Sequence, residues 1–566
     1  MTNRFINDTI YSHIEHTKLE GMILQTKILS RLQFITQNAL AYFSFPSITT
    51  KRYIHSLGTM HLASHMYKSA LLNAKPKLRE KFLADLYEAI KQIQAASNID
   101  KKISKSNLLQ DDSLYQFLIP LRNNKEKYAY LISLQAVRLA GLLHDAGHLP
   151  FSHQVEYAMQ SIYDEQTKLP KTNHSQKEFI RFYEKITENK KKVLHEAMGH
   201  AFADMLFAYE IDEIFDDPAD KNYIKIVYKM IENIFKDELF GGFDFGVLHG
   251  IIDSTVDADR LDYVNRDMLA SGYIGGAVDL LRIAKQTILT SKNSAYRFSF
   301  CDSAILDIEH MLEMRFNLYK KVIFNHQIAK KDAMLENLIV YLANQYFTQE
   351  KKDRLSDISM LWKFADINNL EKKLDTISLL DENWLISLFK EEYFKIKYSL
   401  SAENKEKILM VFEEVLFGKK YFDSVWKNLN DLYNVLGFTL TQKYQFRESF
   451  GYISPSKLQI LKRSLDHFIS YHESKENLFL SYQIVSFTLG VSKNFYLFGE
   501  SGLISIDEIS TLRKRLKKSM LNTVPFFIYS SKKELNKEMK KDLKEILICV
   551  VISSGRLRQG NRAGIL

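Results

Sequence analysis

The chain has 566 residues, of which 46% are hydrophobic and 26% charged, and it carries a modest net charge of +9. That composition is typical of a globular protein with room for two or more structural units. Its two cysteines exclude a disulfide scaffold and favour a reducing, cytoplasmic compartment. Eight prolines and 21 glycines favour a mainly helical protein.

Apolar residues at helical spacing dominate the first part of the chain. Residues 16–47 predict one amphipathic helix that ends in a turn at Pro46, and residues 52–66 predict a second helix. Residues 70–130 are polar and rich in lysine, which we interpret as an insertion or a helical lid.

A strongly apolar helix is expected over residues 134–148, because Pro150 should end it. A second polar insertion is expected at about residues 162–192. Further helices are expected over the segments 193–209, 221–235, 240–251, 253–268 and 303–346.

The character of the chain changes near residue 347. Residues 351–398 predict charged helices, and three short runs then predict strands: 494–498, 524–529 and 545–552. We therefore expect a mainly α protein, with one unit at residues 1–346 and a separate helical and α+β region at residues 347–566 that acts in assembly or regulation.

Nothing in the sequence predicts a membrane segment. The N-terminal residues lack the apolar core of a signal peptide, and the apolar run 546–552 is too short to span a bilayer and is typical of a buried strand. Lysine-rich stretches such as 513–518 indicate either solvated helix faces or a surface for a polyanion, and charge alone does not choose between them.

Histidine and aspartate residues at four separate places indicate a metal site. His144 and Asp145 are neighbours, so both can face one ion only near a helix end or kink, a context that Gly147 and Pro150 provide. Imidazole and carboxylate ligands together suit Mn, Fe, Co, Ni or Zn, and Mg where water completes the coordination. The four motifs are Arg52-Tyr-Ile-His55, His144-Asp145, His148 to Glu156, and Asp257-Ala-Asp259.

In this order the motifs resemble the HD-domain superfamily, and more closely its deoxynucleoside triphosphate (dNTP) triphosphohydrolases, which include the bacterial dGTPases and the SAM-and-HD-domain dNTPases. The resemblance covers about residues 8 to 345. The matching segments are Arg52 to Gly58, His144 to His153, His195-Glu196, Asp257 to Asp267, and Arg315-Phe-Asn-Leu-Tyr319 through His326.

The resemblance implies an HD-domain helical fold for residues 1–346, with a role for each matching residue. The implied metal ligands are His55, His144, Asp145 and Asp259. The implied catalytic group is His148, His153, Glu156 and His195, in which His153 and Glu156 form the pair that transfers protons. The implied substrate-binding residues are Arg52, Asp262, Tyr263, Arg266 and His326.

The reaction that the resemblance implies is attack of metal-activated water on the α-phosphorus of a dNTP, which releases a deoxynucleoside and inorganic triphosphate. Arg52 and Arg266 would hold phosphate oxygens, and Tyr263 would lie against the sugar. Phe324 stands where many relatives have a tyrosine near the nucleoside, so the preferred base, dGTP or another, stays open.

Two of these assignments have structural alternatives. His195 could be a surface residue on one helix face together with His200. Arg266 could be an ion-pair partner of Asp262 or Asp267, because such spacing suits pairs on a helix.

The sequence also leaves regulation and function class open. Residues 8–15 loosely resemble the segment that binds an activating nucleotide in allosteric relatives, so activation and a homo-oligomer are hypotheses. The alternative function is an HD-type phosphodiesterase or nuclease acting on cyclic nucleotides or single-stranded nucleic acid, which the lysine-rich region 347–566 keeps open. A non-catalytic nucleotide-binding regulator is disfavoured by the intact ligand set.

Overall fold

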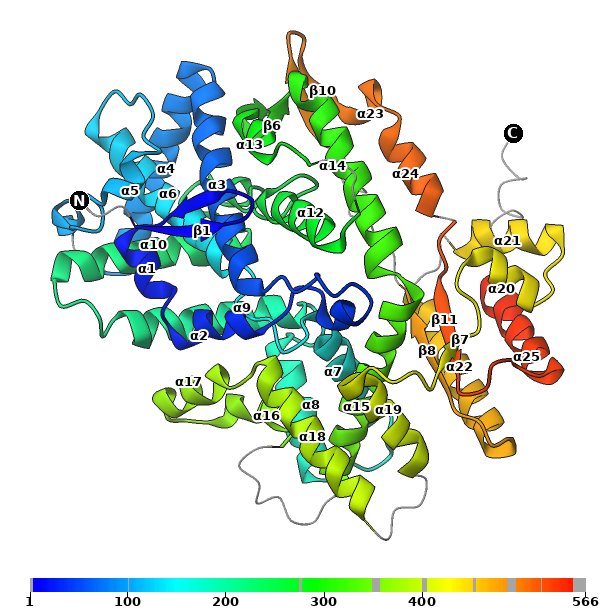
Figure 1. Cartoon of the computed structure of the whole chain (residues 1–566). Helices are drawn as coiled ribbons and strands as arrows, with labels where there is room; N and C mark the ends of the chain where they lie inside the picture. The colour runs from blue at the N-terminus through cyan, green and yellow to red at the C-terminus, as the bar shows by residue number, and fades with distance from the viewer. Residues whose placement is uncertain are drawn as a thin grey trace.

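A computed structural model describes residues 4–99, 101–273, 277–348, 357–399, 405–450, 455–485, 495–520 and 522–552. The architecture is mainly α-helical with small antiparallel and mixed sheets, as predicted (Figure 1). Among these described residues, no helix combines the length and the apolar character needed to cross a membrane.

Three helices form the centre of the molecule: α3 (Arg52–Asn73), α6 (Asn124–Leu143) and α12 (Ala258–Ser271). Helix α3 packs against both of the others. Every residue of α6 from Ala129 onward is buried, which is why its sequence is apolar on all sides. The helices predicted over residues 52–66 and 134–148 are thus confirmed, although α6 already ends at Leu143.

The single helix predicted over residues 16–47 is wrong. The segment forms α1 (Lys18–Ile23), α2 (Lys27–Ser30) and then short 3-10 turns. The side chains of Thr17 and Thr26 each accept a hydrogen bond from a backbone N–H of the following helix, so each threonine starts a new helix. A hairpin of two short strands precedes them: β1 (Phe5–Asp8) and β2 (Ser12–Glu15).

The first polar segment, residues 70–130, is an integral part of the helical core. Its main helix, α4 (Pro76–Ala96), packs against α6 and buries Phe82, Leu86 and Ile90 completely. Within the described ranges, no residue of this segment lines the large cavity of the molecule. The segment therefore does not act as a lid in this structure.

The second polar segment also belongs to packed helices. Helix α7 (His153–Gln166) extends into it and α8 (His174–Ile186) lies against α7. Residues 240–251, for which a helix was predicted, form a β-hairpin and the short α11 (Gly246–His249), because Gly241 and Gly242 adopt positive φ angles in a tight turn. The other helices of this half include α9 (Leu194–Met205), α10 (Pro218–Lys236), α13 (Leu280–Lys285), α14 (Ile305–Leu318) and α15 (His326–Thr348).

The C-terminal residues pack onto the rest of the chain at two places. A four-stranded sheet has the order β10-β9-β6-β5, in which β9 (Tyr496–Gly499) pairs in parallel with β6 (Ala295–Cys301). Its outer strands are β5 (Thr287–Lys292) and β10 (Gly502–Ser505). Strand β9 lies in a segment for which a strand was predicted, and residue 494 of that segment lies outside the described residues.

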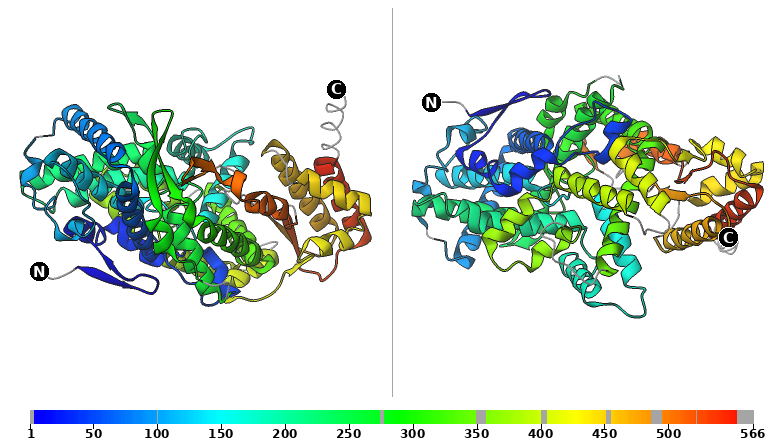
Figure 2. Two further views of the ribbon diagram at one scale, coloured as in Figure 1. Left: turned by 90° about the horizontal axis from the view of Figure 1, so that it is seen from above. Right: turned by 60° about the horizontal axis from the view of Figure 1, so that its bottom comes forward.

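The second contact is made by α15, which packs against α19 (Lys405–Phe417) and β8 (Leu480–Ile484). Strand β8 belongs to a sheet of order β7-β11-β8, with β7 (Asp423–Ser424) and β11 (Phe526–Ser530). Figure 2 shows an elongated molecule in which many of the yellow, orange and red C-terminal segments gather at one end. The boundary proposed near residue 346 thus separates two stretches that pack together.

The strand predicted over residues 545–552 is wrong. Helix α25 (Lys537–Leu547) runs into this segment and continues as a π-helical turn to Ile552. Met539, Leu543 and Leu547 are fully buried at helical spacing, so Leu547 of the apolar run lies on the buried face of a helix rather than in a strand. The other C-terminal helices include α17 (Leu370–Ser378), α18 (Glu382–Tyr398), α20 (Leu429–Val435), α21 (Leu440–Phe450), α22 (Pro455–Lys475) and α24 (Leu512–Met520).

Candidate active site

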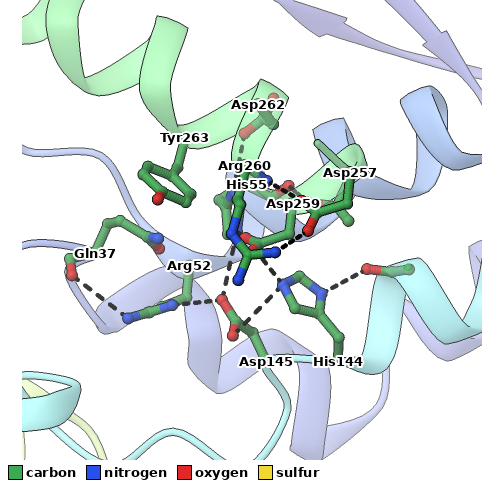
Figure 3. A network of polar contacts seen from close by, with 12 residues as sticks. Gln37, Arg52, His55, His144, Asp145, Asp257, Asp259, Arg260, Asp262 and Tyr263 are labelled. Carbon is green, nitrogen blue, oxygen red and sulfur yellow. Dashed lines mark hydrogen bonds and ion pairs between the residues drawn. The ribbon is translucent and has the colours of Figure 1, made fainter. Parts of the chain in front are cut away.

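The four predicted metal ligands converge where α3, α6 and α12 meet (Figure 3). His55 Nε2 lies 2.9 Å from Asp259 Oδ1 and 3.5 Å from Asp145 Oδ2. His144 Nε2 lies 3.5 Å from a carboxylate oxygen of each aspartate. His144 directly follows the last residue of α6 as its C-cap, so Asp145 lies beyond the helix and can face the same point.

The donor atoms fit a divalent metal ion. The Nε2 atoms of His55 and His144 are buried, yet neither makes a hydrogen bond to a described residue. The ligand atoms of His55, His144 and Asp145 lie within 4.8 Å of one another. His144 Nδ1 donates to the carbonyl of Gly141 at 2.8 Å, which leaves Nε2 as the ligand atom. Two imidazoles and two carboxylates can therefore hold an ion between them.

A buried layer behind His55 orients this ligand. His55 Nδ1 lies 2.8 Å from Asp262 Oδ2, and Asp262 also accepts hydrogen bonds from Arg266 and from the Tyr11 hydroxyl. Arg266 makes a second ion pair with Asp8, at 2.9 Å. Although burial disfavours a charged imidazole, the neighbouring carboxylates of Asp259 and Asp262 raise the pKa of His55 to about 10 in the metal-free protein.

Asp262 and Arg266, both predicted to bind substrate, therefore lie in this layer. Neither is among the described residues that line the cavity. The ion pair between them is the structural alternative that the sequence left open for Arg266. His326 is also absent from the described lining, and its Nδ1 lies 2.9 Å from the Ser424 hydroxyl.

Arg52 lies at the edge of the metal site. Its Nη1 donates to Asp145 Oδ2 at 2.5 Å and its Nε donates to the Ser152 hydroxyl at 3.0 Å. Burial alone would raise the pKa of Asp145, but Arg52, with His144 and His148, holds that pKa well below its usual range. Asp145 is thus ionised at neutral pH, as a metal ligand must be.

The predicted catalytic group forms a second cluster beside the metal site. Glu156 Oε2 lies 2.9 Å from His195 Nδ1 and 3.3 Å from His153 Nδ1, so one carboxylate orients two imidazoles. The rings of His148 and His195 stack at 4.3 Å, and His148 Nε2 reaches Asp145 at 3.2 Å. The structure therefore brings all four residues together and gives His195 a partner inside the site.

Burial favours the neutral imidazole at His148 and at His153. Desolvation lowers the pKa of His153 and holds that of His148 well below its usual range. Glu156 is the opposite case, because the hydrogen bonds from His153 and His195 outweigh burial and lower its pKa. Although surrounding atoms desolvate the ring of His153, 45% of its side chain is exposed to solvent. A neutral, accessible imidazole held by a carboxylate can exchange a proton with a ligand.

Both clusters open into a cavity of about 2330 Å³. Its lining includes residues that the sequence did not single out for substrate binding: Gln37, Arg260, Arg315 and Tyr319. Tyr263, which was predicted, also lines the cavity; its hydroxyl accepts a hydrogen bond from Arg315 Nε at 2.8 Å. Gln37 Oε1 and Arg315 Nη1 are buried without a hydrogen bond to a described residue.

These residues differ in how far the sequence could have indicated them. Arg315 and Tyr319 lie four residues apart in one of the matching segments, so their shared helix face was a usable signal. Gln37 belongs to no matching motif, and only the fold brings it beside Arg52, whose Nη2 contacts its backbone carbonyl at 3.5 Å (Figure 3).

Comparisons with known proteins found similar sequences and a similar solved structure. No family model matches the chain. An uncharacterized protein of Methanocaldococcus jannaschii is 22% identical over 96% of this chain and 82% of that protein. The deoxynucleoside triphosphate triphosphohydrolase SAMHD1 homolog of Dictyostelium discoideum is 22% identical over 58% of this chain, and human SAMHD1 is 24% identical over 58%. The chain spans about half the length of these two enzymes, 47% and 42%.

A solved structure has the same fold. The phosphohydrolase from Bacteroides thetaiotaomicron superposes with a TM-score of 0.51 at 19% identity, over 94% of this chain and all of that one. A putative HD domain-containing protein of Acanthamoeba polyphaga mimivirus is 22% identical over 65% of this chain. The chain is thus similar to HD-domain proteins and to deoxynucleoside triphosphate triphosphohydrolases, and its histidine and aspartate site agrees with that similarity.

Proposed function

We propose that this protein is a metal-dependent dNTP triphosphohydrolase, which converts a dNTP to a deoxynucleoside and inorganic triphosphate. The observation that carries the proposal is the position of the ligand set His55, His144, Asp145 and Asp259 beside the histidine cluster, at one cavity that is lined by all of these ligands except His55. Two of the relatives bear the name of this activity.

The metal supplies Lewis-acid polarisation of a phosphate oxygen and a more acidic water when it is bound. His55, His144, Asp145 and Asp259 would hold it. His153 is neutral and partly exposed, so it can hold a proton that moves to or from the reacting phosphate oxygen. Glu156 fixes the ring of His153 and stabilises its charged form.

We assign the phosphate-binding role to arginines of the cavity wall. Arg52, Arg260 and Arg315 all line the cavity, and a guanidinium binds phosphate oxygens in pairs. Arg266 instead supports the metal site from behind, through Asp262. Tyr263 and the unpartnered amide of Gln37 would contact the sugar, because both face the cavity next to Arg52.

Regulation and substrate preference belong to the same proposal. The hairpin of β1 and β2 would bind the activating nucleotide, and it is connected to the site because Asp8 contacts Arg266 and Tyr11 contacts Asp262. We further propose a homo-oligomer, a preference for dGTP, and a cytoplasmic location, which the scarcity of cysteine favours.

One observation favours the alternative HD-type phosphodiesterase or nuclease. The cavity exceeds the roughly 300–1,000 Å³ of an ordinary small-molecule site and reaches Lys462 and Arg463 on α22. A longer nucleic-acid substrate would use that extension.

Turnover of each dNTP, alone and in mixture, with Mg or Mn tests the proposal. We expect hydrolysis that disappears in Asp145→Ala, and a mixture that is faster than any single dNTP. Absence of dNTP turnover combined with cleavage of a cyclic nucleotide or single-stranded DNA would establish the alternative instead.

A further inference from the structure

We propose that Glu382, the first residue of α18, is a positioning residue that holds the loop between the metal site and His153 in its working conformation. The expected effect on catalysis rests on the proposed function, whereas the positioning of the loop does not. It assigns a specific task to one residue of the region after residue 347.

Glu382 is a buried carboxylate with donors from two other segments. Only 5% of the residue is exposed. Its Oε1 accepts hydrogen bonds from the backbone N–H and the hydroxyl of Thr36, at 2.6 and 2.5 Å, and from the N–H of Phe151 at 3.3 Å. Lys51 Nζ lies 3.6 Å from its other oxygen. One side chain of α18 therefore joins the segment before α3 to the loop before α7.

A continuous chain of hydrogen bonds leads from this carboxylate to the metal site. The carbonyl of Thr36 accepts a hydrogen bond from the Ser152 hydroxyl at 2.6 Å. The same hydroxyl accepts from Arg52 Nε at 3.0 Å, and Arg52 donates to Asp145 at 2.5 Å. A shift of Thr36 would thus move Ser152 and Arg52 together.

The loop needs such support because its backbone is strained. Phe151 and Ser152 have φ angles of 57° and 55°, a region that residues other than glycine rarely adopt. Ser152 stands at the N-terminus of α7 but gives that helix no side-chain cap, because its hydroxyl is used by Thr36 and Arg52. His153 follows directly, so the direction of its side chain depends on this conformation.

Arg31, from the segment before α3, connects the other end of the loop to the turn before α18. Arg31 is 2% exposed and donates to the backbone carbonyls of His148, at 2.8 Å, and of Ala146. It also donates to the carbonyl of Leu380, two residues before Glu382, at 3.3 Å. The turn before α18 is therefore tied to the active-site loop at two points.

The experiment compares Glu382→Ala, Glu382→Gln and, as a matched control, Glu391→Ala, since Glu391 is an exposed glutamate of the same helix. We expect Glu382→Ala to lower kcat about ten- to hundredfold, with KM and bound metal per chain unchanged. Glutamine keeps an acceptor oxygen for Thr36 and Phe151, so Glu382→Gln should stay within about threefold of the wild type.

Loss of kcat and of bound metal in equal proportion, with glutamine behaving like alanine, would mean general destabilisation and would overturn the proposal. So would an unchanged kcat in Glu382→Ala. If Glu382→Ala does not fold, Thr36→Val and Thr36→Ser take its place: the valine should lose kcat and the serine should keep it, and equal kcat values in the two would reject the idea.

Hydrogen exchange of residues 149–154 separates this inference from the proposed function, because it needs no substrate. Glu382→Ala should exchange faster there than the wild type while α6 is unchanged. If Glu382→Ala exchanges faster but the wild type hydrolyses no dNTP, the positioning role is supported and only the proposed reaction is wrong. Unchanged exchange would refute the positioning role.

Discussion

Replacing Asp262 with asparagine removes the group that orients His55. Asp262 is fully buried and accepts four hydrogen bonds: from His55 Nδ1, from Nε and Nη2 of Arg266, and from the Tyr11 hydroxyl, at 2.8 to 3.0 Å. Asparagine has one acceptor oxygen, which can serve either the His55 side or the Tyr11 side. The other side then faces an NH2 group, which donates instead of accepting.

The expected size of the effect follows from these contacts. With an NH2 group beside Nδ1, His55 favours the tautomer that carries its proton on Nε2, which cannot bind a metal ion. Metal affinity should fall about 10- to 100-fold, or about 1.4–2.7 kcal/mol. Since Arg266 also loses a buried charge partner, the free energy of unfolding should fall by about 3–5 kcal/mol.

Metal binding by calorimetry and unfolding in denaturant measure the two effects separately. Asp111→Asn is the matched control, because Asp111 is also buried and paired with an arginine, Arg4, away from the site. The control should lose stability without changing metal affinity. A metal affinity of Asp262→Asn within threefold of the wild type would refute the orienting role of Asp262.

Three other predictions test the site. Glu156→Gln should lower kcat by about 10²–10⁴ at unchanged metal content, because two imidazoles lose their carboxylate; steady-state kinetics with metal analysis measures both. Gly147→Ala should lower the free energy of unfolding by about 1–3 kcal/mol and reduce activity, since a Cβ there would lie 2.0 Å from the carbonyl oxygen of His195. Thermal unfolding measures the loss of stability. Gly250→Ala is the control, because its Cβ would meet nothing closer than 3.5 Å and its stability should change little. Between pH 7 and 9, metal affinity should rise about tenfold per pH unit, because the pKa of His55 near 10 means that the metal displaces a proton. In the metal-free protein the same group contributes stability that is full below about pH 6.5 and is lost as the pH rises through about 10. Calorimetry in buffers of different ionisation enthalpy should detect about one proton released per metal at pH 7, and no release would contradict the prediction.

The sequence indicated the helical fold well where one pattern decided the outcome. Helix α6 is apolar on all sides and α3 carries a clear helical period, so both were found. The segment 16–47 has the same period but is cut by the capping threonines Thr17 and Thr26, whose effect depends on competing local hydrogen bonds. The run 545–552 is apolar enough for a strand, and only packing against its neighbours shows a helix.

The candidate site divides in a similar way. Adjacent residues such as His144 and Asp145, or residues three apart such as His153 and Glu156, form local motifs that a sequence can display. The spacing of Arg266 and Asp262 indicated the ion pair between them, but the second partner of Arg266, Asp8, lies 258 positions away, and no local pattern predicts that contact. Gln37 and Glu382 reach the site only through tertiary packing, which is why neither could be found from spacing.

Hydrolysis of a dNTP in water enriched in oxygen-18, with mass analysis of both products, tests the central claim most directly. Attack of water on the α-phosphorus predicts one heavy oxygen in the inorganic triphosphate and none in the deoxynucleoside. The two products should form in equal amounts, and neither should form with Asp145→Ala. Heavy oxygen in the deoxynucleoside, or a deoxynucleoside monophosphate with pyrophosphate as the products, would contradict the proposed reaction.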